Sequence, residues 1–300
     1  MKQITENALR NSILRVFPDF RKAEFKYNRS GWTSVVVDIN NEYICKFPRT
    51  EQKFAFLKTE NLIIEKLARA FPKIEFPQRR FVDSDIPFFI HKKLSGEFID
   101  VDRYNRLTAL EQDNFIDSIA DFFVGLHRLP VDEFKDIVKN KDEELPDWDI
   151  LHLALKTDFN AAEMKKISSI IDKFSNLDDK ALKVVGYYDF HAYNTLFDAD
   201  TKKLQGIFDF DEVAIGTAKF DLREVFLNYN MEIGTAVLDA YNKKASNPVS
   251  LEIVKLSLIG WSFVEYMNMK QKIASGELSD VTGADLSEFR AEIKQMLETY

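Results

Sequence analysis

The sequence predicts a bilobal α+β protein, in which an N-terminal lobe built on an antiparallel sheet with one crossing helix precedes a mainly helical C-terminal lobe. Two observations predict this division. Residues 1–93 contain most of the runs with strand-like alternation, and beyond Gly96 the apolar residues recur at helical spacing. A β-rich island at residues 184–209 interrupts the helical part. We therefore expect one lobe over residues 1–93 and a second over residues 94–300.

The N-terminal lobe is expected to start with a helix, because apolar residues recur at helical spacing over residues 9–17. The runs that follow the strand pattern are residues 23–28, 33–39, 43–47, 80–82 and 87–92. Asn40 and Asn41 tolerate the positive φ of a tight turn, so the second and third runs should form an antiparallel hairpin. An apolar stripe over residues 54–71 predicts the crossing helix.

The helical part is expected to begin near Thr108 and Glu111, which have the spacing of a capping box and precede an apolar stripe. Within the β-rich island, the expected strands are residues 184–188, 195–197 and 204–209. From Lys219 the pattern returns to helix. The chemistry of the C-terminal lobe should therefore lie on the inserted strands and the turns between them.

Composition and charge exclude several classes of protein. Hydrophobic residues make up 45% of the 300 residues and charged residues 30%, as in ordinary globular proteins. The net charge of -8 argues against nucleic acid as a partner and suits cationic ligands. Cys45 is the single cysteine, so an intrachain disulfide or a cysteine-based zinc cluster is impossible. With no signal sequence or membrane span in view, we expect a cytoplasmic monomer that binds no membrane.

The island carries three side chains that suit phosphoryl transfer. This reaction needs an acid that accepts a hydroxyl proton, and oxygen ligands for Mg²⁺ that also contacts the nucleotide phosphates. Asp189 is followed five residues later by Asn194, and Asp209 ends the next pair of strands. We expect Asp189 to deprotonate the acceptor hydroxyl, and Asn194 and Asp209 to hold the metal.

Five runs resemble the aminoglycoside phosphotransferase and choline kinase superfamily. Its signature, His-Gly/Asn-Asp-x4-Asn followed by an Ile-Asp-Phe/Trp block, is similar to Tyr187–Asn194 and Ile207–Glu212. Its later Gly-Asp-Pro-x-x-Asp-Leu is similar to Ile215–Leu222, and its Leu-His helix end is similar to Gly125–Leu129. The run Asn41–Arg49 resembles the branch that phosphorylates the 2''-hydroxyl of aminoglycosides. Three of these blocks follow one another in the family's order.

The resemblance spans residues 30–266 and implies a protein-kinase-like fold whose N-terminal lobe binds ATP or GTP. In that fold a strand lysine contacts the phosphates and a helix glutamate holds the lysine, which assigns these roles to Lys46 and Glu60. Either residue alone would be taken for an ordinary surface charge. Further nucleotide contacts are implied for the strand turn at Ser30 and Gly31 and for the hinge residues Ile90, His91 and Lys92.

Three positions depart from the family pattern. Tyr187 stands where the family has His, Tyr188 where it has Gly or Asn, and Thr217-Ala218 where it has Asp-Pro. Asp189 itself is intact, which predicts that activity is kept. His127 and His191 are expected to support the structure and not to bind metal.

We expect a small-molecule kinase that transfers the γ-phosphoryl group of ATP or GTP to a hydroxyl of a cationic acceptor, first of all an aminoglycoside, as in antibiotic resistance. Two alternatives stay open. The acceptor is choline, ethanolamine, homoserine or another metabolite, or the chain is a nucleotide-binding pseudokinase. For a cationic acceptor, we expect Asp211, Glu212 and Glu265 to form an acidic surface beside Asp189. The family's substrate helix has an acid where Val264 stands, one position before Glu265.

Overall fold

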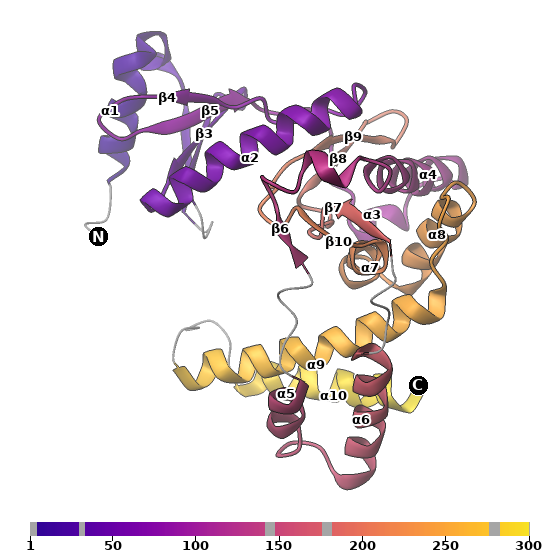
Figure 1. Ribbon diagram of the computed structural model, residues 1–300. Helices are drawn as coiled ribbons and strands as arrows, with labels where there is room; N and C mark the ends of the chain where they lie inside the picture. The colour runs from indigo at the N-terminus through magenta and orange to yellow at the C-terminus, as the bar shows by residue number, and fades with distance from the viewer. Residues whose placement is uncertain (1–4, 30–33, 142–147, 176–181, 276–282, 300) are drawn as a thin grey trace. The chain divides into compact units, whose positions relative to one another are not determined.

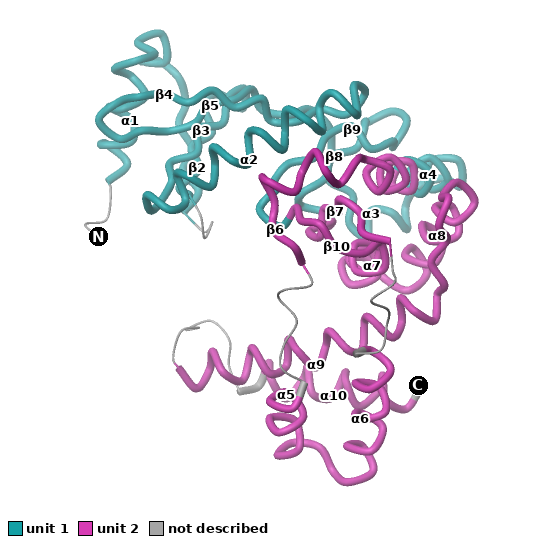
Figure 2. The backbone as a smooth tube through the Cα atoms, viewed as in Figure 1, with its two compact units in different colours: residues 1–118, 192–212 teal, residues 119–191, 213–300 magenta. Residues whose placement is uncertain are grey.

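The computed structural model describes residues 5–29, 34–141, 148–175, 182–275 and 283–299. The chain forms two compact units (Figure 2). Unit 1 contains residues 1–118 and 192–212, and unit 2 contains residues 119–191 and 213–300. The expected division into lobes at residue 93 stays a prediction. None of the described helices combines the length and apolar character needed to span a bilayer.

Unit 1 is built on a five-stranded antiparallel sheet in the order β1-β2-β3-β5-β4 (Figure 1). Its strands are β1 (Phe25–Asn28), β2 (Ser34–Ile39), β3 (Tyr43–Pro48), β4 (Arg80–Val82) and β5 (Phe88–Lys92). Asn40 and Asn41 turn the chain from β2 into β3 with φ values of 55° and 59°. The predicted hairpin is therefore confirmed, since this left-handed turn matches the twist of the two strands.

Different helices cover the two faces of this sheet. One face packs against α1 (Glu6–Val16) and buries a core that includes Leu9, Ile13, Cys45 and Phe47. Because side chains alternate along a strand, Lys46 lies on the opposite face. That face is approached by α2 (Glu51–Ala70), whose Phe54 ring lies 5.6 Å from the ring of Phe89 on β5. One turn of 3₁₀ helix, η1 (Pro18–Lys22), connects α1 to β1.

Beyond the sheet, unit 1 contains α3 (Val101–Tyr104), the beginning of α4 (Ala109–Leu126) and the hairpin of β8 (Thr195–Phe197) with β9 (Leu204–Ile207). Thr108 and Glu111 form the predicted capping box: the Thr108 N–H donates to Glu111 Oε2 at 2.8 Å, and the Glu111 N–H donates to Thr108 Oγ1 at 3.4 Å. Ser118 Oγ on α4 accepts from the Leu204 N–H at 2.9 Å. This bond ties the β8–β9 hairpin to the helix within unit 1.

Unit 2 is mainly helical and also contains a three-stranded sheet in the order β6-β10-β7 (Figure 1). Its strands are β6 (Lys139–Asn140), β7 (Lys183–Gly186) and β10 (Ala214–Thr217), and its helices, besides the end of α4, are η2 (Val131–Glu133), α5 (Trp148–Leu155), α6 (Ala161–Ser175), α7 (Ala218–Asn228), α8 (Met231–Asn242), α9 (Leu251–Ser275) and α10 (Gly283–Thr299). Buried side chains of α5, α6, α9 and α10 form one core. The predicted α+β class, with an antiparallel N-terminal sheet and a helical C-terminal part, is confirmed.

Candidate active site

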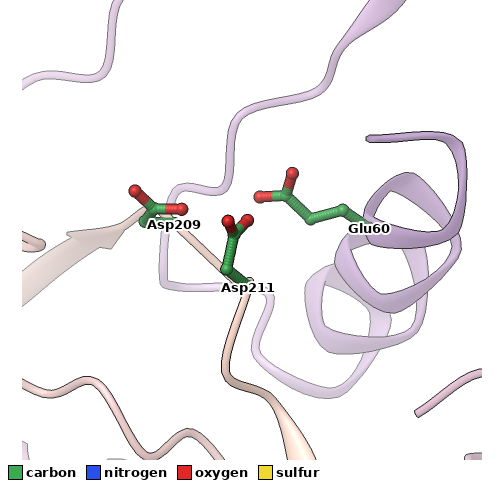
Figure 3. Close-up of side chains that lie close together, drawn as sticks. All are labelled: Glu60, Asp209 and Asp211. Atoms are coloured by element: carbon green, nitrogen blue, oxygen red, sulfur yellow. The ribbon is translucent and has the colours of Figure 1, made fainter. Parts of the chain in front are cut away.

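Three carboxylates of unit 1 lie together at the end of β9. Glu60 reaches from α2 toward Asp209 and Asp211, and oxygen atoms of the three side chains lie within 4.8 Å of one another (Figure 3). We had expected Asp209 as a metal ligand, Asp211 as a contact for the acceptor and Glu60 as the partner of Lys46. The structure brings all three side chains into one cluster.

Hydrogen bonds on both sides of Asp209 fix the turn that carries it. The Phe208 N–H donates to the carbonyl oxygen of Asn194 at 3.1 Å, and the Phe210 N–H donates to Glu60 Oε1 at 3.1 Å. Asp209 itself has a φ of 67°, a left-handed conformation that is rare for residues other than glycine. The Phe210 ring is fully buried, 5.8 Å from the ring of Phe76. The two expected metal ligands, Asn194 and Asp209, are thus held on one rigid framework.

The ion-pair partner of Glu60 in the described part of the chain is Arg79, in the segment before β4. Arg79 Nη1 contacts Glu60 Oε2, and both side chains are fully buried. Lys46 makes no ion pair with Glu60 within 4.0 Å among the described residues, although it lies near enough to influence the glutamate. Arg79 was not predicted from the sequence. The signal that could have found it is the position of Glu60 within the apolar stripe of α2, because a buried carboxylate needs a cation as partner.

Burial and neighbouring charges perturb the ionisation of this cluster. Burial raises the pKa of Glu60, but the Arg79 guanidinium, the Lys46 ammonium and the Phe210 N–H outweigh it, so the pKa is lowered. Burial lowers the pKa of Lys46, and Arg79 lowers it further. Burial, with the nearby charges of Asp209 and Glu60, raises the pKa of Asp211 to about 7. At Asp211, burial and the two neighbouring carboxylates therefore outweigh the opposing effect of the Lys46 and Lys53 ammonium groups on the pKa.

This donor set fits a hard divalent cation such as Mg²⁺. Carboxylate oxygens are its preferred protein ligands, and a bound cation would offset the charges of Asp209 and Glu60 that add to the effect of burial on the pKa of Asp211. Asn194, whose side chain is buried, is placed beside the cluster by its backbone bond to Phe208.

The expected hinge residues lie on β5. The Ile90 side chain belongs to the core on the α1 face, so only its backbone is available to a ligand. β4 begins at Arg80, which is opposite Ile90, so β4 pairs with no residue of β5 beyond that point. The backbone of His91 and Lys92 is thus paired with β3 on one side only. Burial lowers the pKa of His91 to about 4, so its ring is neutral. Ser30 and Gly31 lie outside the described residues.

The loop that carries Asp189 belongs to unit 2 and is anchored by Asp221 on α7. The Asp221 carboxylate accepts hydrogen bonds from the N–H groups of Tyr187, at 2.9 Å, and Tyr188, at 2.7 Å. His127 Nε2 lies 3.0 Å from the same carboxylate, and His127 Nδ1 lies 3.0 Å from the Tyr241 hydroxyl. This arrangement suits the structural role that we expected for His127. The sequence had placed Asp221 in a family motif without showing what it holds.

Tyr188, which departs from the family pattern, contacts Thr217, a second position that departs from it. Its φ of 58° explains why glycine or asparagine suits this position. A Cβ atom on Gly186 or Gly216 would overlap the Tyr188 ring, so the two glycines provide the space that it fills. The Tyr188 hydroxyl then donates to the carbonyl oxygen of Thr217 at 3.3 Å.

Asp189 follows this anchored loop with a partly exposed side chain, at 36%. His191 Nε2 lies 3.7 Å from Asp189 Oδ1, beyond hydrogen-bond range. Glu265 lies half-buried on α9, where its Oε1 accepts from Asn268 Nδ2 at 3.5 Å. Glu265 and Asp189 belong to unit 2, whereas Asp211 and Glu212 belong to unit 1. The acidic surface that we expected from these residues stays a prediction.

Comparison with known proteins gives the same family as the motifs. A model described as the phosphotransferase enzyme family matches residues 24–253. The fold is similar to the GDP and kanamycin complex of APH(2'')-IIia, with 16% identity, a TM-score of 0.77 and coverage of 97% of this chain and 98% of that chain. The ADP-bound aminoglycoside phosphotransferase APH(2'')-Ib is 23% identical, with a TM-score of 0.68 and 96% of each chain covered.

A macrolide 2'-phosphotransferase, MphH from Brachybacterium faecium, is also similar, with 13% identity, a TM-score of 0.64 and coverage of 96% of this chain and 98% of that chain. At these identities the structural similarity concerns the fold, and it confirms the kinase-like fold that the motifs implied. The superfamily that the motifs indicated is confirmed by the family model, and the structures with this fold include members of the 2'' branch. Because the family model matches more than half of the sequence, the chain belongs to the phosphotransferase enzyme family.

Proposed function

We propose that this phosphotransferase transfers the γ-phosphoryl group of ATP or GTP to a hydroxyl of a small cationic acceptor, with an aminoglycoside as the first candidate. The observation that carries the proposal is the carboxylate cluster of Glu60, Asp209 and Asp211, which lies at the end of β9 where the family motif predicts a metal ligand. Lys46 lies on the sheet face that α2 approaches, as a phosphate ligand requires.

In this mechanism the acceptor oxygen forms a bond to the γ-phosphorus as the bond from that phosphorus to the β–γ bridging oxygen breaks. The hydroxyl proton passes to Asp189, and the nucleoside diphosphate leaves. Lys46 contacts the donor phosphates, and the backbone of His91 and Lys92 receives the base. Asn194 and Asp209 would hold Mg²⁺, which offsets negative charge on the phosphates. Asp221 keeps Asp189 in place through its bonds to Tyr187 and Tyr188.

Three observations support a cationic acceptor. The net charge is -8, and Glu212 directly follows Asp211, the last carboxylate of the cluster. Two similar structures were determined with streptomycin and ATP and with gentamicin, both as complexes of APH(2'')-IIa. A small metabolite with an ammonium group would meet the same electrostatic requirement, so choline, ethanolamine and homoserine are alternatives.

A screen of nucleotide consumption tests the proposal. The purified protein is supplied with ATP or GTP and Mg²⁺, together with aminoglycosides, amino alcohols or macrolides in turn. We expect acceptor-dependent release of diphosphate that requires Mg²⁺ and is lost in Asp189→Asn. Binding of nucleotide without acceptor-dependent turnover, for every compound, would favour the pseudokinase alternative.

A further inference from the structure

The buried ion pair of Arg79 and Glu60 is the feature of unit 1 that phosphoryl transfer leaves unexplained. Both side chains are fully buried, and the cost of removing two charges from water can exceed the attraction between them. Arg79 Nε and Nη2 also have no hydrogen-bond partner among the described residues. A buried ion pair is in general a weak source of stability, so the position of this one in the cluster calls for another explanation.

Glu60 uses its two oxygens for different partners. Oε2 contacts Arg79 Nη1, while Oε1 accepts the Phe210 N–H at 3.1 Å. Phe210 stands between Asp209 and Asp211, so its hydrogen bond to Glu60 holds the backbone at the centre of this turn. Glu60 therefore links Arg79 to the segment that carries both aspartates.

We propose that Arg79 is a positioning residue for the metal site: it fixes Glu60, and Glu60 in turn fixes the turn of Asp209 and Asp211, which leaves the Lys46 ammonium for the phosphates of the donor. This inference rests on the proposed function. In the family pattern the strand lysine, here Lys46, pairs with the helix glutamate, here Glu60; the proposal assigns this pairing to Arg79 instead.

The geometry favours Arg79 over Lys46 in this part. Arg79 contacts the glutamate, whereas Lys46 makes no ion pair with it within the described residues. Arg79 is a fixed charge at every accessible pH, while the Lys46 ammonium is disfavoured by burial and by Arg79 itself. If Lys46 had both roles, its single ammonium group would have to bind Glu60 and the donor phosphates at the same time. With Arg79 bound to Glu60, Lys46 is available for the phosphates alone.

Double-mutant cycles decide which cation acts through Glu60. The variants are Arg79→Met, Glu60→Gln and Lys46→Met, alone and in pairs, with Arg79→Lys as the conservative variant. Arg80→Met is a matched control, because Arg80 is the exposed neighbour, and stacks on Phe17. The first readout is the dissociation constant for Mn²⁺ alone, from the loss of its free-ion paramagnetic resonance signal. The second is the dissociation constant for ADP.

We expect Arg79→Met and Glu60→Gln each to weaken Mn²⁺ binding by about tenfold or more, as the loss of residues that orient metal ligands does. The pair of substitutions should weaken it no further than either alone, because Arg79 acts through Glu60. Arg79→Lys should recover most of the affinity, since one nitrogen makes the contact. Lys46→Met should weaken ADP binding independently of Arg79→Met.

Two results would overturn the inference. Tighter Mn²⁺ binding in Arg79→Met would show that Arg79 only offsets negative charge. Additive effects of Arg79→Met and Glu60→Gln, with coupling between Lys46 and Glu60 instead, would assign the positioning role to Lys46. If Arg79→Met does not fold because Glu60 is left unpaired, Glu60→Gln is compared with the double variant, and equal Mn²⁺ affinities are expected. These binding results stand whether or not an acceptor is found, so a failed acceptor screen is distinguished from a failed inference.

Discussion

Gly216 on β10 and Gly186 on β7 both lie against the ring of Tyr188. In the antiparallel ladder Gly186 is opposite Ala214, two residues before Gly216. A Cβ atom at Gly216 would overlap the Tyr188 hydroxyl and would lie 3.0 Å from Cζ of its ring and 3.1 Å from Cβ of Lys141. The Tyr188 ring, next to Asp189 in the sequence, therefore has room only because Gly216 on β10 carries no side chain.

Gly216→Ala should lower the free energy of unfolding by about 1–3 kcal/mol, the usual cost of an overpacked core, and should reduce turnover because the Tyr188 ring must move. The measurements are chemical unfolding and kcat. Tyr188→Asn in the Gly216→Ala background should recover part of the loss, because asparagine is smaller and tolerates positive φ. Gly206→Ala is the matched control, since its Cβ would meet its nearest neighbour at 3.5 Å, an ordinary contact. Equal destabilisation by both alanines would contradict the packing argument.

Asp189→Asn should reduce kcat by at least about 100-fold, the usual effect of removing a positioned base, while nucleotide affinity changes little. The reason is that Asp189 faces the acceptor in the proposed mechanism, and the hydrogen bonds of Asp221 to the preceding loop do not involve its side chain. Turnover and nucleotide binding are measured on the same preparation. Near-wild-type turnover would remove Asp189 from the role of base.

Neutralising Glu212 or Glu265 should raise KM for a cationic acceptor several-fold and make it less sensitive to salt, because a partly screened ion pair contributes only ~1 kcal/mol. Nucleotide affinity should be unchanged. KM is measured at two ionic strengths in Glu212→Gln, Glu265→Gln and the wild type. Identical values in all three would favour an uncharged acceptor.

Cys45 should resist thiol reagents in the native state, because its side chain is fully buried in the α1 face of the sheet and burial raises its pKa to about 12. As the pH rises above the ordinary thiol value of 9.0, the unfolded chain loses this proton before the folded one does. The contribution of Cys45 to stability is therefore present below that pH and declines above it. Labelling with a chromogenic disulfide, in buffer and in denaturant, gives the first check.

Comparing wild type with Cys45→Ala in unfolding experiments between pH 8 and 10 gives the second check, since the stability difference should shrink toward the higher pH. Rapid native-state labelling at neutral pH would contradict the burial of this thiol.

Local patterns in the sequence predicted the elements of unit 1 well. The strand at residues 80–82 was predicted with the bounds it has, because β-branched and aromatic residues stand between clear breaks. The hairpin at Asn40 and Asn41 followed from residue chemistry alone. In unit 2, β10 was missed as a strand, because the four residues Ala214–Thr217 contain a glycine and show too short a pattern.

The candidate site was predictable only where a motif marks it. Asp189, Asn194 and Asp209 stand in a recognisable order, whereas Arg79 precedes β4 in a segment without a pattern and reaches Glu60 through the tertiary fold. The packing of the Tyr188 ring was also invisible, because Gly216, one of the two glycines that leave room for it, lies on a strand much later in the sequence. Pairings of this kind are decided by three-dimensional packing, which no window of neighbouring residues records.

The space that Gly186 and Gly216 leave for the Tyr188 ring also limits the order in which these residues can have changed during evolution. A chain with a side chain at either glycine position has no room for the tyrosine, so both glycines had to be present before it arrived. Once it is in place, any substitution at either glycine is penalised, even one that an ancestor tolerated. Among related sequences, a tyrosine immediately before the aspartate that corresponds to Asp189 should therefore occur together with glycine at both positions.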